Sequence, residues 1–124
     1  MAKILLVEDE KMLAEMYRLR FEREGFEMIE ASTAEEGVVL AKKEKPDLIL
    51  LDILLPRASG IEALKTLKED PETKDIPIII FSNYDTPKVR EKVKEYGVKY
   101  ILKSNVTTEE LIKIVKEELE SLKK

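Results

Sequence analysis

The residues that could carry chemistry in this chain stand directly after short apolar runs. They comprise three carboxylates, one hydroxyl and one ammonium group: Glu8, Asp9, Asp52, Ser82 and Lys103. Carboxylates held close together repel one another unless cations neutralise them. The lysine supplies one positive charge, and a hard divalent cation such as Mg²⁺, which binds carboxylates, waters and phosphate oxygens, would supply the rest. Such a set suits phosphoryl chemistry, with a carboxylate as the nucleophile and the hydroxyl as a hydrogen-bond donor.

The hydropathy pattern predicts the elements that must position these side chains. Five apolar runs, at residues 4–7, 26–31, 48–51, 76–81 and 100–102, alternate with five segments of helical period. The helical stripes are Leu13, Met16, Tyr17 and Arg20; Ala34, Val38 and Ala41; Ile61, Leu64 and Leu67; Val89, Val93 and Tyr96; and Leu111, Ile112, Val115, Leu119 and Leu122. Five strand–helix units in succession predict an α/β fold with one parallel sheet and helices on both faces.

Signals for the ends of helices and strands agree with this division. Two pairs have the spacing of a capping box, Ser32 with Glu35 and Thr107 with Glu110, and so predict two helix starts. The remaining signals are glycines at helix ends and prolines just before or within strand starts: Gly25, Gly97, Pro46 and Pro77.

The composition of each strand predicts the strand order. Runs 4–7, 48–51 and 76–81 are almost continuously apolar, which is typical of central strands covered on both faces. Run 26–31 contains Glu27 and Glu30, and run 100–102 is short, so both should lie at sheet edges. The order 2-1-3-4-5 meets these conditions and is the flavodoxin-like, doubly wound order. Because ligands bind outside the carboxyl ends of the strands in such sheets, the polar residues after the strands should form one site.

Composition excludes several other classes of protein. The 124 residues include no cysteine and no histidine, so disulfides, thiolate metal sites, a cysteine nucleophile and a histidine general base are excluded. A net charge of −4 and a pI near 5.1 argue against direct nucleic-acid binding. No apolar run approaches the roughly 20 residues of a membrane span, and the start MAKILLVEDE does not suit a signal peptide. We therefore expect a cytoplasmic protein without a membrane partner, forming a single domain over residues 1–124.

Taken together, the motifs VEDE, LILLDILLP with its later glycine, IIIFS and YILK resemble the receiver domain of two-component response regulators. The resemblance covers the whole chain, and the spacings between Asp52, Ser82 and Lys103 match the family pattern. It implies that Asp52 is the phosphoacceptor. It also implies that Glu8 and Asp9, together with Asp52 and the backbone carbonyl of Leu54, hold Mg²⁺ or Mn²⁺.

The same resemblance implies a switch and its partners. Lys103 should contact the phosphoryl oxygens, Ser82 should move towards them, and Tyr100 should act as an aromatic switch that follows Ser82. The readout would be the surface of the fourth helix, fifth strand and fifth helix, which is also a candidate surface for homodimerisation. The phosphodonor would be a sensor histidine kinase, a phosphotransfer protein or a small molecule. The target would be a downstream protein or an output domain on another chain. The protein would not be an enzyme beyond phosphorylating and dephosphorylating itself with Mg²⁺.

Two residues of the candidate site depart from the family pattern. Ser104 replaces the proline that usually follows the lysine, often after a cis bond; without proline we expect a trans bond between Lys103 and Ser104. Asn83 replaces a small residue after the strand-4 hydroxyl, and would either narrow the pocket or donate a hydrogen bond to the phosphoryl group. Ala58 and Ser59 are also unusual in their loop, but Gly60 remains, so the turn should persist.

Leu54 and Tyr84 should flank the path of a hydrolytic water, since each stands two residues after a site residue, Asp52 or Ser82. Polar residues at these positions in the family help to orient that water, whereas leucine and tyrosine would exclude it. With Asn83, they are therefore the candidates that tune the lifetime of the phosphorylated state, and we expect slow dephosphorylation.

Other functions remain as alternatives. A pseudo-receiver, an interaction module that works without phosphate, is favoured by the departures at Asn83 and Ser104. A phosphatase of the haloacid dehalogenase type needs a second acid where this chain has Leu54, and a flavin protein needs a hydroxyl-rich loop after the first strand. Purely structural roles stay open for Ser82, as a residue that ends a strand, and for Tyr100, as a packing residue of an edge strand.

Overall fold

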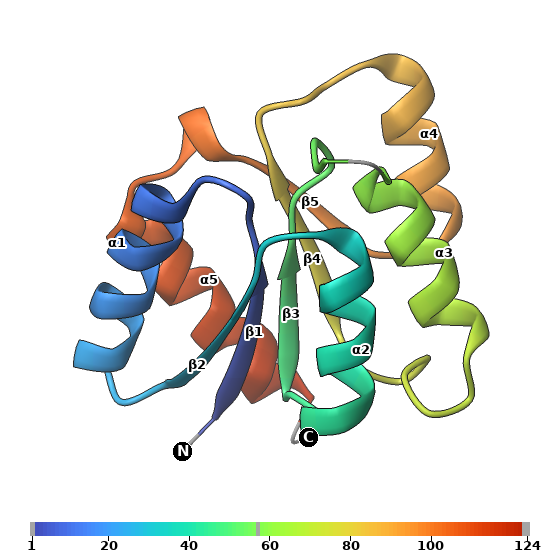
Figure 1. Ribbon diagram of the computed structural model, residues 1–124. Helices are drawn as coiled ribbons and strands as arrows, with labels where there is room; N and C mark the ends of the chain where they lie inside the picture. The colour runs from blue at the N-terminus through green and yellow to red at the C-terminus, as the bar shows by residue number, and fades with distance from the viewer. Residues whose placement is uncertain (1, 57, 123–124) are drawn as a thin grey trace.

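The computed structural model describes residues 2–56 and 58–122, which form a five-stranded parallel sheet between two layers of helices (Figure 1). The strands are β1 (Lys3–Val7), β2 (Glu27–Ala31), β3 (Leu48–Leu51), β4 (Ile78–Ser82) and β5 (Lys99–Leu102). The helices are α1 (Lys11–Arg23), α2 (Ala34–Glu44), α3 (Gly60–Glu69), α4 (Pro87–Glu95) and α5 (Thr108–Ser121), with a 3₁₀ turn at Lys103–Asn105. The predicted alternation of strands and helices is confirmed.

The strand order is β2-β1-β3-β4-β5, as predicted, and all four pairings are parallel. The register aligns Val7 with Leu51, and Ser82 with Leu102, so β1, β3, β4 and β5 all finish at the same end of the sheet, its carboxyl end. The fold is therefore the flavodoxin-like doubly wound arrangement, and its topology brings the polar residues after these strands to the same end.

Each face of the sheet carries its own hydrophobic core. Helices α1 and α5 cover one face, and α2, α3 and α4 cover the other (Figure 1). In β1, Ile4 and Leu6 pack on the α1–α5 side, while Leu5 and Val7 pack on the opposite side. This alternation follows from the two-residue period of a strand. The central strands are buried on both faces, which explains their continuous apolar runs.

The predicted helix ends are confirmed except at the start of α2. Thr107 and Glu110 form the capping box of α5. At α2, however, the N-cap is Thr33, whose hydroxyl accepts a hydrogen bond from the Glu36 N–H at 3.1 Å. The pairing of Ser32 with Glu35 was therefore wrong by one residue, because the sequence STAEE offers the same spacing twice. Gly25 and Gly97 end their helices with positive φ angles of 94° and 68°, as predicted.

The buried face of α1 differs from the predicted stripe. Ala14, Tyr17 and Phe21 are buried, whereas Met16 is 39% exposed and Leu13 is only half-buried. Apolar residues lie on more than one side of this helix, so periodicity alone could not select the side that packs on the sheet. At the end of α5, Leu122 is likewise exposed rather than part of the core. The other helical stripes pack against the core clusters as predicted.

Four strands have bounds that differ from the predicted apolar runs. Strand β1 begins at Lys3, β2 begins at Glu27, β4 spans Ile78–Ser82, and β5 begins at Lys99.

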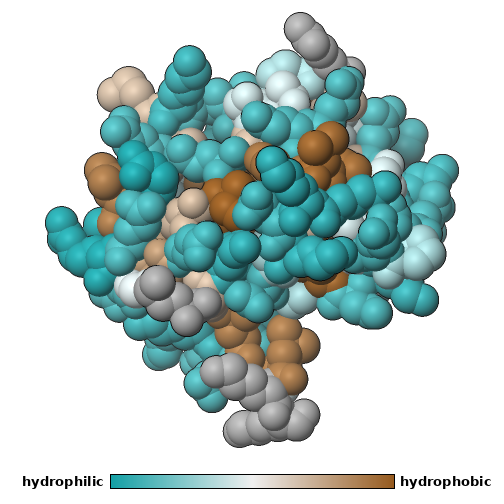
Figure 2. Space-filling model, turned by 60° about the horizontal axis from the view of Figure 1, so that its bottom comes forward, coloured by the Kyte–Doolittle hydropathy of each residue, from teal (hydrophilic) through white to brown (hydrophobic). Residues whose placement is uncertain are grey.

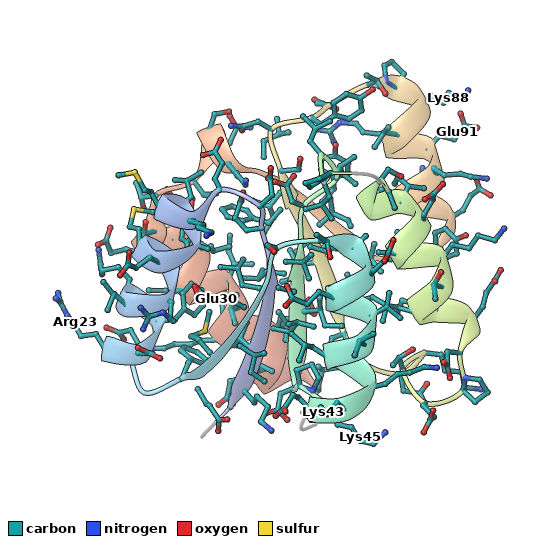
Figure 3. The ribbon with its side chains drawn as sticks, viewed as in Figure 1. Arg23, Glu30, Lys43, Lys45, Lys88 and Glu91 are labelled. Carbon is teal, nitrogen blue, oxygen red and sulfur yellow. The ribbon has the colours of Figure 1, made fainter. Side chains whose placement is uncertain are left out.

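The outer surface of the protein is strongly polar. Charged side chains such as Arg23 and Lys88 extend away from the sheet (Figure 3), and the face shown in Figure 2 is mainly hydrophilic, with hydrophobic side chains in small separate patches. Among the residues described, no helix is both long enough and apolar enough to cross a membrane.

Candidate functional site

The carboxylates of the site are fixed by main-chain hydrogen bonds that continue the sheet past its strand ends. The Glu8 N–H donates to the Ala31 carbonyl at 2.9 Å, and the Asp52 N–H donates to the Val7 carbonyl at 3.2 Å. Glu8 and Asp52 therefore stand one residue beyond β1 and β3, but on the same rigid frame. In β1 the residue before Glu8 on the α1–α5 side is Leu6, so the alternation of the strand turns Glu8 towards that side.

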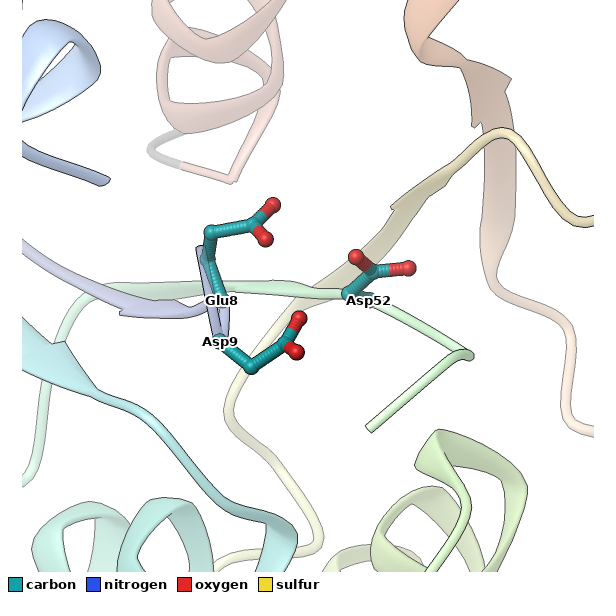
Figure 4. A group of neighbouring side chains, drawn as sticks. All are labelled: Glu8, Asp9 and Asp52. Atoms are coloured by element: carbon teal, nitrogen blue, oxygen red, sulfur yellow. The ribbon is translucent and has the colours of Figure 1, made fainter. Parts of the chain in front are cut away.

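Glu8, Asp9 and Asp52 point their carboxylates towards one another (Figure 4). One oxygen from each lies within 4.8 Å of the other two. Glu8 and Asp52 are only 4% and 6% exposed, while Asp9 is exposed. Oxygen ligands gathered at this separation, two of them buried and one facing solvent, fit a hard cation such as Mg²⁺ that retains waters. The structure thus brings together the three acidic side chains predicted as metal ligands.

Lys103 lies between two of these acids. Its ammonium donates to Asp52 Oδ2 at 2.9 Å and also to Glu8 Oε1, and its side chain is only 12% exposed. Three carboxylates and one ammonium group leave two net negative charges when all are ionised. The site therefore remains attractive to a divalent cation even with the lysine in place.

Burial and hydrogen bonds shift the pKa values of Glu8 and Lys103. Burial raises the pKa of Glu8 above its usual value, although hydrogen bonds from Lys103 and from the Glu10 N–H act to lower it. Burial on its own would lower the pKa of Lys103, but the hydrogen bonds to Glu8 and Asp52 outweigh it and hold that pKa above its usual value. Lys103 is consequently a cation at neutral pH.

Ser82 is fully buried at the end of β4. Its hydroxyl oxygen accepts a hydrogen bond from the Tyr84 N–H at 3.1 Å. Within the described parts of the chain, Ser82 makes no hydrogen bond to Asp52, so the two groups share the end of the sheet without direct contact. Because the oxygen acts as an acceptor here, the hydroxyl hydrogen is still available for donation.

Asn83 and Ser104 meet at the carboxyl end of the sheet, just after β4 and β5. The Ser104 N–H donates to Asn83 Oδ1 at 2.8 Å. The side-chain oxygen of Asn83 is therefore turned towards the loop after β5. This contact differs from both roles that the sequence suggested for Asn83, which were to narrow the pocket or to donate a hydrogen bond to a phosphoryl group. All peptide bonds between described residues are trans, including Lys103–Ser104, as expected without proline.

Tyr100 is held between a carbonyl group and a cation. Its hydroxyl donates to the Tyr84 carbonyl, and the Arg90 guanidinium lies 4.8 Å from the centroid of its ring. Arg90 is in turn paired with Asp85 through a 2.5 Å contact. Burial is the main cause that raises the pKa of the Tyr100 hydroxyl. Tyr84 therefore touches Ser82 through its N–H and Tyr100 through its carbonyl.

The loop after β3 holds Leu54 and, less expectedly, depends on Gly60. The Leu54 N–H donates to Asp52 Oδ1 at 3.3 Å, and the Leu54 side chain is 58% exposed. A Cβ atom on Gly60 would lie 1.9 Å from the backbone oxygen of Asp52. Sequence reasoning assigned Gly60 only to the turn and missed this close approach, since nothing in the sequence shows which backbone segment a glycine faces.

Comparison with known proteins agrees with this geometry. The model of the response regulator receiver domain family matches residues 4–116, which is most of the chain. The chain belongs to the response regulator receiver domain family. Receiver domains of two-component systems are phosphorylation switches that bind Mg²⁺ at an acidic pocket and interact with histidine kinases or phosphotransfer proteins and with downstream targets.

Individual relatives show the same likeness along almost the whole chain. Protein PilH of Pseudomonas aeruginosa is 37% identical over 117 residues, which cover 93% of this chain and 95% of PilH. The polar-differentiation response regulator DivK of Brucella anthropi is 31% identical over 113 residues, covering 91% and 92%. Among solved structures, a CheY-like receiver domain protein from Methanospirillum hungatei has a TM-score of 0.91 with 28% identity, covering 98% of this chain and 95% of that one.

Proposed function

We propose that Asp52 is the phosphoacceptor of a signalling switch. The observation that carries this proposal is the position of its buried carboxylate, within metal-ligand reach of Glu8 and Asp9 and hydrogen-bonded to the ammonium of Lys103. A nucleophilic carboxylate, a metal site and a fixed cation are the groups that phosphoryl transfer needs, because the reaction depends on positioning and electrostatic stabilisation.

In the proposed reaction, an oxygen of Asp52 forms a bond to phosphorus as the bond from phosphorus to the donor breaks. When the donor is a phosphohistidine, the electron pair of the P–N bond leaves with the imidazole, which takes up a proton. Lys103 neutralises charge on the phosphoryl oxygens. Glu8, Asp9, Asp52 and the Leu54 carbonyl would hold Mg²⁺ or Mn²⁺, which when bound supplies further positive charge to those oxygens. No histidine is needed in this chain, since the phosphohistidine belongs to the partner.

The contacts of Tyr84 support a route from the phosphoryl group to the surface. The Ser82 hydroxyl would donate its free hydrogen to a phosphoryl oxygen, and a movement of Ser82 would pull on the Tyr84 N–H that it binds. The carbonyl of Tyr84 is bonded to the hydroxyl of Tyr100 on β5, so the position of Tyr100 would follow. Such a movement would alter the α4–β5–α5 surface, where a downstream partner or a second copy of the chain would bind.

Phosphorylation of purified protein tests the proposal. We expect incubation with acetyl phosphate and Mg²⁺ to add the mass of one phosphoryl group, and Asp52→Asn to abolish the gain. Asp75→Asn, which changes an exposed carboxylate before β4, is the matched control and should retain it. An adduct that persists in Asp52→Asn would contradict the assignment. If wild-type protein gives no adduct and binds no Mg²⁺, the pseudo-receiver alternative would replace it.

A further inference from the structure

The two departures from the family pattern touch each other. Asn83 directly follows the hydroxyl residue Ser82, and Ser104 directly follows Lys103. The two are 21 positions apart in the chain, yet a 2.8 Å hydrogen bond joins Asn83 Oδ1 to the Ser104 N–H. This bond requires both departures, because alanine at position 83 would offer no side-chain acceptor and proline at position 104 would have no N–H.

The bond lies next to the catalytic ammonium. Lys103 is the first residue of the 3₁₀ turn Lys103–Asn105, and its side chain turns inward to Asp52 and Glu8. Ser104 is the second residue of that turn, so fixing its N–H fixes the main chain one residue beyond Lys103. The other end of the bond is anchored on β4 through Ser82, which is fully buried.

We propose that Asn83 is a positioning residue that sets the path of the Lys103–Asn105 turn through the Ser104 N–H and so places the Lys103 ammonium at Asp52. The inference deepens the proposed function and rests on it, since the position of Lys103 matters for phosphoryl transfer.

Because Asn83 and Ser104 are exposed, their hydrogen bond should affect the position of Lys103 more than the stability of the fold. Asn83 and Ser104 are both exposed, so water can replace the bond if it is lost, and the fold should hardly lose stability. The reaction, in contrast, is sensitive to small displacements of the ammonium, because a misplaced charge stabilises the phosphoryl oxygens less. Loss of the bond should therefore slow phosphorylation without unfolding the protein.

A double-mutant cycle tests the inference. Asn83→Ala and Ser104→Pro should each slow phosphorylation at saturating acetyl phosphate by about 3- to 10-fold. Adding Asn83→Ala to the Ser104→Pro protein should slow it no further, because the bond is already absent. Ser104→Ala keeps the backbone N–H and is the matched control, which should phosphorylate at the wild-type rate. The half-saturating donor concentration and the thermal midpoint should change little in Asn83→Ala.

Nuclear magnetic resonance gives a readout that does not depend on phosphorylation. In ¹⁵N-labelled protein, the Ser104 amide should exchange faster with solvent in Asn83→Ala, and the Lys103 side-chain ammonium signal should shift. An Asn83→Ala protein with wild-type phosphorylation and an unshifted ammonium signal would overturn the inference, as would additive effects in the cycle. If wild-type protein accepts no phosphoryl group, the proposed function fails, while the amide and ammonium signals still decide whether Asn83 positions Lys103.

Discussion

Lys103 and Asp52, 51 positions apart in the chain, are joined by a 2.9 Å hydrogen bond between Nζ and Oδ2. The same ammonium also binds Glu8, so one lysine neutralises charge on two buried acids. The bond forms because β3 and β5 both end at the carboxyl end of the sheet. Leu50 and Ile101 pack on the α1–α5 side, so the two-residue period of a strand puts Asp52 and Lys103 on that side as well. The same contact that stabilises the buried charge of Asp52 also places an ammonium beside the proposed phosphoacceptor.

Removing the Lys103 ammonium should therefore slow phosphorylation strongly. In Lys103→Met we expect the rate with acetyl phosphate to fall by about 100-fold, the effect typical of losing one preorganised donor to a developing anion. Intact-mass measurement over time gives the rate. Lys99→Met, which removes an exposed lysine at the start of β5, the strand before Lys103, should leave the rate unchanged. A Lys103→Met protein that is phosphorylated at the wild-type rate would contradict the role of this residue.

Asp9 offers a test of the metal site that spares the fold. Because Asp9 is exposed and Glu8 and Asp52 are buried, Asp9→Asn should weaken Mg²⁺ binding by at least about tenfold without lowering the metal-free thermal midpoint. Calorimetric titration with Mg²⁺ measures the affinity. Glu10→Gln changes the exposed acid next in sequence and serves as the control. Equal affinities in all three proteins would remove Asp9 from the ligand set.

Gly60 should tolerate no side chain. In Gly60→Ala the new Cβ would meet the Asp52 backbone oxygen at 1.9 Å, so the loop after β3 must shift, at a cost of about 1–3 kcal/mol in the free energy of unfolding. Phosphorylation should slow as well, since the displaced segment carries Asp52, the proposed phosphoacceptor. Gly37→Ala is the comparison, because its Cβ would meet the side chain of Val7 at 2.9 Å rather than a backbone atom. Its loss in free energy of unfolding, measured in urea, should be smaller than that of Gly60→Ala. The opposite ranking would be inconsistent with the structure.

The pH dependence of stability should include a contribution from Asp70. Asp70 Oδ2 lies 2.7 Å from Lys42 Nζ, and this hydrogen bond is the main cause that lowers the pKa of Asp70 below its usual value. The unfolded chain therefore binds more protons than the folded protein as the pH falls below about 4, and the stabilisation present above that pH is lost on acidification.

Asp70→Asn removes this contribution, so its free energy of unfolding should fall less steeply with acid than that of the wild-type protein. Urea unfolding at several pH values between neutral and about pH 3 measures the slope. Asp75→Asn alters an exposed carboxylate of the same connection and should keep the wild-type slope. Identical slopes in the wild-type and Asp70→Asn proteins would show that the ion pair contributes no acid dependence.

Leu54 should lengthen the life of the phosphorylated state. Its apolar side chain is exposed in the loop after β3, two residues beyond the proposed phosphoacceptor Asp52, and offers no polar group to orient a hydrolytic water. We expect decay over minutes or longer in wild-type protein with Mg²⁺, and faster decay in Leu54→Asn. Val39→Asn replaces another exposed apolar residue, on α2, and should decay at the wild-type rate. Wild-type decay within seconds would contradict this expectation.

Several features followed from local sequence because each depends on one strand or one helix end. The apolar runs of β1, β3 and β4, the acids of β2 and the short β5 were enough for the strand order. That order in turn placed Glu8, Asp9, Asp52 and Lys103 at one end of the sheet. The period of a strand and the direction of parallel strands are fixed by covalent geometry, so these positions needed no knowledge of packing.

Other features were decided only by the tertiary structure. The buried side of α1, the choice of Thr33 over Ser32 as a cap and the backbone that faces Gly60 depend on which surfaces meet. The direction of Asn83 is the clearest case, since the sequence did not reveal that its Oδ1 would accept a hydrogen bond from the Ser104 N–H, 21 positions away. The sequence determines which side chains lie at the carboxyl end of the sheet. The hydrogen-bond partner of each side chain depends on distances between loops that are far apart in the chain.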